Sequence, residues 1–224
     1  MTKASAERQP SRFAANVYLI VGIAVLIFSS GSDDTLVRYL VGSAVEIGLV
    51  LLMLPFLRIE KVAVRPALRI KRPDRSTVLL ALGWIPALWL SGVLLNLIAV
   101  VIFGYTTPVP PWTYPSTLPE ALLLILTTTV VAPICEELIF RGYILSAYEN
   151  RRVWIGILVT SLIFALYHLR LQGVFALIPI SIGLGVVAWR TGSVFPSMAM
   201  HAAYNGIATI IMIIALAIIA IAVI

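Results

Sequence analysis

Long apolar stretches, most of them free of charged residues, recur along the chain. A helix needs about 20 consecutive apolar residues to cross the hydrocarbon core of a bilayer. Stretches of about this length occupy residues 13–32, 39–57, 78–104, 118–148, 153–169, 173–189 and 193–224. The pattern predicts an all-α fold, a polytopic membrane helical bundle of about seven transmembrane helices, with six to eight as the range.

The two ends of the chain define the expected domain organisation. Residues 1–12 are polar and weakly basic, and we interpret them as a cytoplasmic tail. Residues 13–32 are too long for the core of a signal peptide, so we expect a retained first span. Residues 193–224 are long enough for one tilted helix or for a helix plus a broken segment. Residues 13–224 are therefore expected to form a single membrane domain.

Composition supports the membrane assignment. The chain of 224 residues is 61% hydrophobic and 12% charged, with mean hydropathy +1.04. Soluble domains carry about 25% charged residues. The sequence pI near 9.8 would indicate a nucleic-acid partner in a soluble protein. Here the basic residues flank the apolar stretches, so topology explains them and no nucleic acid is expected.

Lysine and arginine also predict the orientation. The loop between the first two apolar stretches has Arg38 together with Asp33 and Asp34. Most other lysines and arginines lie in the N-terminal tail, in residues 58–75, at Arg151 and Arg152, and at Arg190. The positive-inside rule places these segments in the cytoplasm. We expect a multi-pass protein of a prokaryotic plasma membrane, with its N-terminus cytoplasmic and, after seven spans, its C-terminus outside.

Three ionisable residues lie within the fourth apolar stretch. Charged groups cost roughly 2.5–3.5 kcal/mol each at the centre of a membrane helix, so they usually mark function. Glu137 and Arg141 are four residues apart and can pair on one helix face. Glu136 points about 100° away and stays available as a general base. A buried structural ion triad is the alternative. Pro133, one turn earlier, predicts a kink that frees backbone carbonyls.

The two histidines of the chain, His168 and His201, lie in later apolar stretches. Asn205, one turn after His201, could donate its amide to a developing oxyanion. Each histidine could instead be a hydrogen-bonded core residue, and Asn205 an interhelical contact. Counted from the nearest turns, Glu136 and His168 lie at similar depths whereas His201 is shallower, so the three meet only if helices tilt or turns differ in depth.

Two further residues bear on the interpretation. Cys135 is the only cysteine, which excludes an intrachain disulfide. Its anionic, apolar surroundings disfavour a thiolate nucleophile. Glu46 interrupts the second apolar stretch, where it could line a cavity, pair with Arg141 or face the bundle interior.

The motifs together resemble the CPBP family of intramembrane proteases, which includes the type II CAAX prenyl proteases and proteins of bacteriocin processing and immunity. The resemblance covers about residues 118–207, the expected catalytic core. It rests on three motifs in order along the chain, namely Glu136-Glu137-x-x-x-Arg141, Phe164-x-x-x-His168 and His201-x-x-x-Asn205.

The resemblance implies a role for each motif residue in hydrolysis of a peptide bond of a membrane-associated protein or peptide. Glu136 and His168 would activate water, and His201 and Asn205 would stabilise the oxyanion. Glu137 and Arg141 would hold the site together.

Two questions of mechanism and class stay open at this point. Glu136, His168 and His201 also form a set that could bind Zn²⁺ with one open position, and the same residues could act without a metal. The alternative to an enzyme is a non-enzymatic immunity or scaffold factor, or a proton-coupled transporter.

Overall fold

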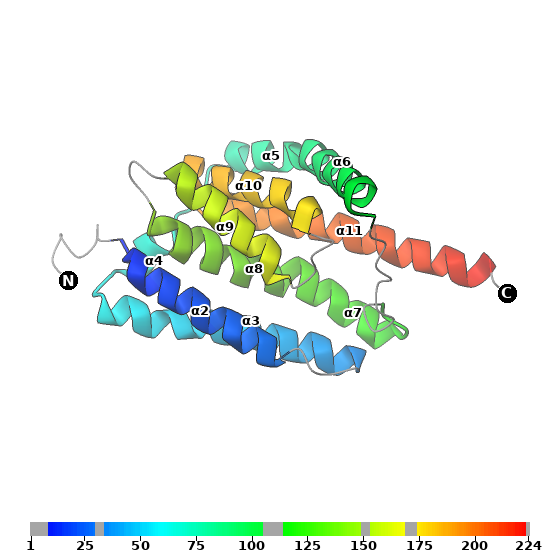
Figure 1. The fold of residues 1–224 in the computed structure, drawn as a ribbon, viewed down its shortest axis with the longest axis horizontal. Coiled ribbons are helices and arrows are strands. Elements are labelled where there is room, and N and C mark those ends of the chain that lie inside the picture. The colour runs from blue at the N-terminus through cyan, green and yellow to red at the C-terminus, as the bar shows by residue number, and fades with distance from the viewer. Residues whose placement is uncertain (1–8, 30–33, 105–113, 149–152, 169–173, 223–224) are drawn as a thin grey trace.

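The protein is described by a computed structural model that covers residues 9–29, 34–104, 114–148, 153–168 and 174–222. Every regular element in these ranges is helical, which confirms the all-α prediction (Figure 1). In chain order the elements are α2 (Arg12–Ser29), α3 (Thr35–Ile59), α4 (Val64–Ala67), α5 (Arg75–Gly83), α6 (Ile85–Phe103), α7 (Leu118–Leu126), the π-helix η2 (Thr127–Val131), α8 (Ala132–Glu136), the π-helix η3 (Glu137–Ile144), α9 (Val153–Tyr167), α10 (Val174–Thr191) and α11 (Phe195–Ala222).

The helices correspond to the seven predicted spans. Five helical stretches in the described part of the chain are long and apolar enough to cross a membrane, and α2 and α9 are shorter apolar helices. The third span is interrupted at Trp84, which separates α5 from α6. The last span is one continuous helix of 28 residues, α11, so the open choice between one helix and two is decided for one. The protein is a multi-pass helical membrane protein.

The fourth span changes its winding along its length. It begins at Thr117, whose side chain caps the helix together with Glu120. It then alternates between α-helix and two π-helical stretches on either side of Pro133. A π-helix bonds residue i to residue i+5, which leaves carbonyls without their usual partners. The hydroxyls of Thr127, Thr128 and Thr129 each donate to a carbonyl three or four residues earlier, at 2.6–3.0 Å.

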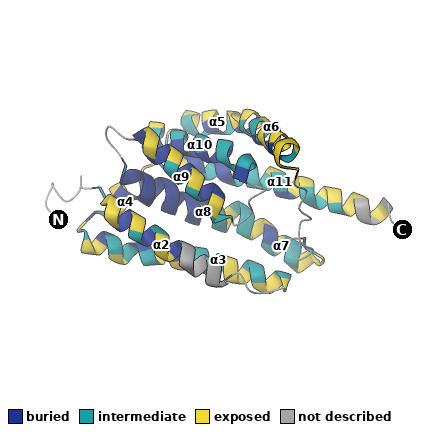
Figure 2. Cartoon of the chain, viewed as in Figure 1, coloured by how far each residue is buried: buried dark blue, intermediate teal, exposed yellow. Residues whose placement is uncertain are grey.

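The second half of this span forms the centre of the bundle. Every residue from 139 to 147 is buried (Figure 2). In Figure 1, α2 and α3 lie on one side of it and α9, α10 and α11 on the other. A helix that is enclosed on all faces can hold charged groups only where they are paired. The fold thus places Glu136, Glu137 and Arg141 away from lipid.

A short segment around α4 closes one end of the bundle. The main chain of Leu68 lies against Gly142, where an added Cβ would be 3.1 Å from the Leu68 Cα. The same segment reaches the turn between α10 and α11, because the hydroxyl of Ser193 donates to the Lys71 carbonyl at 2.6 Å and the Val194 amide donates to the Arg69 carbonyl at 3.2 Å. The turn is therefore folded into the protein.

Candidate active site

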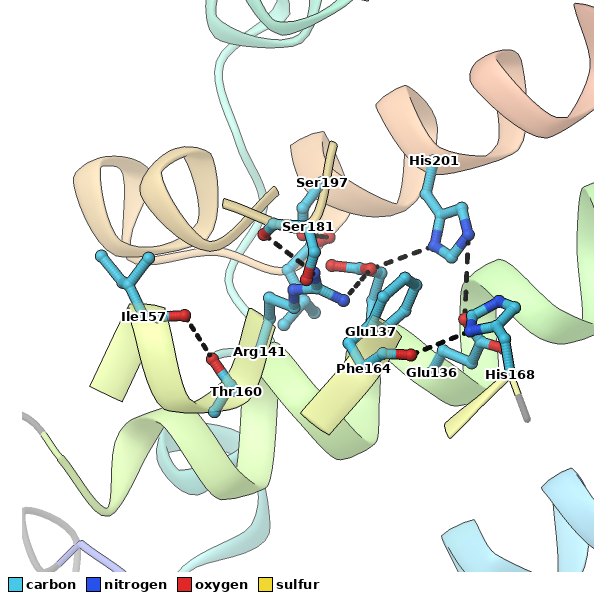
Figure 3. A network of polar contacts seen from close by, with 11 residues as sticks. Glu136, Glu137, Arg141, Ile157, Thr160, Phe164, His168, Ser181, Ser197 and His201 are labelled. Carbon is cyan, nitrogen blue, oxygen red and sulfur yellow. Dashed lines mark hydrogen bonds and ion pairs between the residues drawn. The ribbon is translucent and has the colours of Figure 1, made fainter. Parts of the chain in front are cut away.

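A buried ion pair links Glu137 to Arg141, as their spacing predicts. Arg141 Nη1 donates to Glu137 Oε1 at 2.9 Å, and neither residue has any exposed surface (Figure 3). Arg141 Nη2 also donates to the carbonyl and the hydroxyl of Ser181 on α10, at 2.9 and 2.7 Å. The guanidinium therefore joins the central span to α10.

His201 connects this pair to Glu136. Its Nδ1 lies 3.1 Å from Glu137 Oε1 and its Nε2 lies 3.8 Å from Glu136 Oε2. A carboxylate can only accept, so Nδ1 carries the proton that is shared with Glu137. The Nε2 then faces Glu136 across a separation that exceeds a direct hydrogen bond. Glu136 Oε2 is buried and has no hydrogen-bond partner among the described residues.

Phe164 brings the second histidine to the same place. His168 Nδ1 donates to the Phe164 carbonyl at 2.9 Å, because a carbonyl can only accept. The ring of Phe164 lies 4.9 Å from the ring of His168 and 5.6 Å from that of His201, centroid to centroid. Figure 3 shows the two histidines and Glu136 in one network. In its neutral form, His168 thus has Nε2 as its basic nitrogen.

The structure also explains how His201 reaches the depth of Glu136. The number of residues between His201 and the preceding turn predicts a shallower position for His201, unless that turn lies deeper than the others. Ser193 and Val194 in that turn are buried beneath the α4 segment. The turn is therefore enclosed by the protein, and His201 lies 3.8 Å from Glu136 and 3.1 Å from Glu137.

Asn205 lies one turn beyond His201 and contacts the π-helical stretch. Its Nδ2 donates to the Thr128 carbonyl at 3.0 Å, and one turn further Thr209 lies 3.2 Å from the Thr128 hydroxyl. This is an interhelical contact, the alternative to an oxyanion role for Asn205. The amide has a second N–H, so the oxyanion role stays a prediction.

Glu46 lines a small polar cavity between α3 and the central span. The cavity has a volume of about 160 Å³, and Arg38, Ser43 and Thr128 are among the residues that line it. Glu46 also interacts electrostatically with Glu136. Arg141 is bound by Glu137 and Ser181 and not by Glu46, and the cavity that Glu46 lines contains none of the motif residues.

Two serines of the site were missed by sequence reasoning. The carbonyl and the hydroxyl of Ser181 accept hydrogen bonds from Arg141. Ser197, one turn before His201, lies beside Glu137. Both are completely buried. A serine at helical spacing from a motif residue is a signal for such a role, but serine is also common in apolar helices, where it bonds to its own backbone.

A zinc site at Glu136, His168 and His201 requires suitable donor atoms and side chains that lie close together. The chemistry of the donors suits the metal, since the hydrogen bonds at Nδ1 favour the neutral tautomer in which Nε2 of each histidine has the lone pair. However, no group of three His, Cys, Asp or Glu side chains in the described residues is gathered closely enough to hold a metal ion. The present arrangement does not form a zinc site, and zinc binding by Glu136, His168 and His201 stays a prediction.

Fold and site together define a polytopic helical membrane protein with a buried glutamate–histidine centre. Residues 118–207 match the profile of the family described as type II CAAX prenyl endopeptidase Rce1-like. This match over about two fifths of the chain confirms the resemblance that the three motifs indicate. The matched segment contains every residue of the predicted site.

Two curated relatives are similar over part of their length. An uncharacterized 24.3 kDa protein of Escherichia coli is 32% identical over 90 residues, which cover 38% of this chain and 42% of that protein. The UPF0177 protein YbdI of Lactococcus lactis is 34% identical over 77 residues, which cover 34% of this chain and 41% of that protein. The alignments thus span about two fifths of these relatives. No solved structure matches the chain.

Proposed function

We propose that this protein is an intramembrane endopeptidase that hydrolyses a peptide bond of a membrane-associated protein or peptide. The observation that carries the proposal is the buried, unbonded Glu136 Oε2 at 3.8 Å from His201 Nε2. One water hydrogen-bonded to both groups spans such a separation, since a hydrogen bond between water and either a carboxylate oxygen or an imidazole nitrogen is about 2.8 Å long. A carboxylate that is held dry beside an imidazole is suited to general-base catalysis.

The first chemical step is attack by water on the scissile carbonyl carbon. Glu136 takes a proton from the water as the new C–O bond forms, and the carbonyl oxygen becomes an oxyanion. The Phe164 carbonyl fixes the His168 proton on Nδ1, so Nε2 can accept a hydrogen bond from the attacking water and help to orient it, while the proton itself passes to Glu136. Collapse of the tetrahedral intermediate then breaks the C–N bond, and the proton held by Glu136 passes to the leaving nitrogen.

The oxyanion is assigned to His201 and Asn205. The Glu137 carboxylate accepts from Nδ1 of His201 and is the counter-charge for an imidazolium, whose Nε2–H would donate to the oxyanion. The second N–H of Asn205 is the other donor. Arg141 and Ser181 act only on position, since they hold Glu137 in the orientation that His201 requires.

A metal would change the chemistry but not the set of residues. Zinc held by Glu136, His168 and His201 would act as a Lewis acid on the carbonyl and lower the pKa of bound water. The described geometry does not gather these three side chains around an ion, so the proposed steps use the protein groups alone.

The substrate is proposed only by class. The site lies inside the bundle, so a substrate must reach it from the bilayer or its surface, and the bilayer is a necessary partner. Prenylated proteins and bacteriocin precursors are two kinds of substrate within this class. The competing functions are a non-enzymatic immunity or scaffold factor and a proton-coupled transporter. A transporter could use a buried glutamate and histidine as a proton relay, so a cleavage assay is needed to distinguish it from a protease.

The test compares membranes that contain the wild-type protein with membranes that contain Glu136→Gln. New peptide termini are identified by mass spectrometry after labelling of free amines. Glu120→Gln is the matched control, since this residue lies on the same span and a glutamine serves its capping role equally well. Termini present with wild type and Glu120→Gln but absent with Glu136→Gln support the proposal. Identical termini in all three samples would exclude it.

A further inference from the structure

A groove runs along the bundle between α10 and the helices α5 and α6, and its lining includes none of Glu136, His168 and His201. Its inner part has a volume of about 400 Å³ and is lined by apolar residues that include Leu88, Pro179 and Met200. Its outer part has a volume of about 340 Å³ and ends at Thr77, Arg190 and Thr191. The two parts share Trp84, Val186 and Val187, so they form one continuous lateral groove.

The shape of this lateral groove follows from how α6 and α5 meet α10. Helix α6 approaches α10 closely, because a Cβ on Gly183 would lie 2.6 Å from Leu88 and a Cβ on Gly92 would lie 2.8 Å from the Ala176 carbonyl. The break at Trp84 ends this close contact. Beyond it, Thr77 and Leu80 of α5 and Val187 and Arg190 of α10 line the outer part of the groove. Figure 1 shows α5 and α6 as separate helices beside α10.

The length of the lateral groove matches one leaflet of a bilayer. Pro179 and Arg190 are 11 residues apart on one helix, which corresponds to about 16 Å at 1.5 Å per residue. The hydrocarbon core of a bilayer is about 30 Å thick, so one leaflet contributes about 15 Å. The apolar part of the groove therefore extends through one leaflet, and its polar end lies where α10 ends and α5 begins.

The polar end is basic. Arg190 is exposed and its guanidinium lies over the ring of Trp189, 5.2 Å from the centroid. The segment leading into α5 adds three exposed basic residues, Lys71, Arg72 and Arg75. The one acidic residue of that segment, Asp74, accepts a hydrogen bond from the Ser76 hydroxyl. Net positive charge at headgroup level attracts anionic lipids.

We infer that the lateral groove is a binding site for an anionic phospholipid, with one acyl chain along Trp84 and Val187 and the phosphate at Arg190. The apolar length accounts for the chain and the basic end for the headgroup. A zwitterionic lipid also has a phosphate, but its cationic headgroup would lie near the same basic residues, so an anionic headgroup fits better. This site is separate from the proposed hydrolytic site and does not depend on it.

The test uses Trp84 as the reporter, since its side chain is 57% exposed and lies in both parts of the groove. The purified full chain is reconstituted into two sets of phosphatidylcholine vesicles. One set contains a fraction of phosphatidylglycerol with brominated acyl chains, and the other contains the same fraction of phosphatidylcholine with brominated acyl chains. The quenching that is lost in Trp84→Phe is assigned to Trp84. We expect the relative binding constant for phosphatidylglycerol to be about fivefold higher, the size that one basic residue near the surface provides.

Arginine variants assign the preference to the groove. Arg190→Gln should abolish it, and Arg190→Lys should retain it because the charge remains. Arg58→Gln is the matched control, since Arg58 is also exposed in the last turn of a helix but lies on α3, on the other side of the bundle. Equal quenching of Trp84 by both lipids in the wild type would overturn the inference. A preference that survives Arg190→Gln, or that Arg58→Gln also removes, would overturn it as well.

Discussion

The guanidinium carbon of Arg141 lies 4.4 Å from the centroid of the Phe164 ring, the same ring that contacts both histidines. An aromatic face attracts a cation, and the attraction reaches about 2 kcal/mol where both groups are desolvated. Phe164 thus connects the ion pair on the central span to His168 and His201. The phenylalanine of the second motif is a structural partner of the charged groups as well as an apolar neighbour.

Phe164→Leu should lower the free energy of unfolding by about 2 kcal/mol, because leucine retains most of the apolar volume but not the ring. The thermal midpoint of the protein in detergent measures the change. Phe175→Leu is the control, since Phe175 is stacked on Phe103 outside the site. Equal losses in both variants would mean that the ring contributes only packing.

Arg141→Met should be among the most destabilising single changes in the protein. It leaves Glu137 buried without its partner, which costs roughly 3–5 kcal/mol. The double variant Glu137→Gln/Arg141→Met removes the orphaned charge and should recover part of this loss. Denaturant or thermal unfolding of the two variants gives the comparison. A double variant that is less stable than the single one would contradict a charge-pair role.

Gly142→Ala should destabilise the protein by about 1–3 kcal/mol, as overpacking of a core does. The added Cβ would lie 3.1 Å from the Leu68 Cα and its carbonyl oxygen, and main-chain atoms cannot rotate away. Gly48→Ala is the control, because this glycine lies inside α3 and an added Cβ meets nothing within 4 Å. The control should melt at or above the wild-type temperature. If both variants melt alike, the α4 segment does not pack tightly on the central span.

Asn205→Ala should reduce both stability and proteolysis. Loss of the bond to the Thr128 carbonyl costs about 1 kcal/mol of stability. Loss of an oxyanion donor lowers the turnover number about 10²–10³-fold. Unfolding and cleavage are measured on the same preparation, once a substrate has been identified. A stability loss without a change in turnover would leave Asn205 as an interhelical contact only.

Metal analysis decides the zinc prediction. If Glu136, His168 and His201 bind zinc, the purified protein should contain about one zinc per chain. The metal and the activity should then be lost together on chelation and return together when zinc is added. Glu136→Gln should also reduce the zinc content. Cleavage at full rate by a metal-free preparation would show that the glutamate and the histidines act alone.

The sequence predicted the residues of the site better than their arrangement. Spacing alone paired Glu137 with Arg141, because two residues four apart in a helix must be neighbours. It could not place His201, since the depth of the turn before α11 depends on the contacts of Ser193 and Val194 with the α4 segment. Those contacts join residues more than 100 positions apart in the chain.

The hydropathy pattern had a similar limit within single spans. It marked residues 78–104 and 118–148 as helical but contained no sign of their internal changes. The break at Trp84 and the π-helical winding around Pro133 replace one hydrogen-bonding pattern by another within an unchanged apolar stretch. Pro133 marked one of these places, whereas the charged residues from Glu137 to Ile144 indicated a site but gave no sign of π-helical winding.

The local pairing of Glu137 with Arg141 has a consequence for biogenesis. During synthesis the central span leaves the ribosome before α10 and α11, which supply Ser181 and His201. The later partners are absent when this segment first meets the membrane, but Arg141 and Glu137 lie on the same helix and can neutralise each other at once. Only Glu136 then enters as an uncompensated group, at a cost of roughly 3 kcal/mol. The order of translation thus favours a site whose strongest charge pair is built within a single helix.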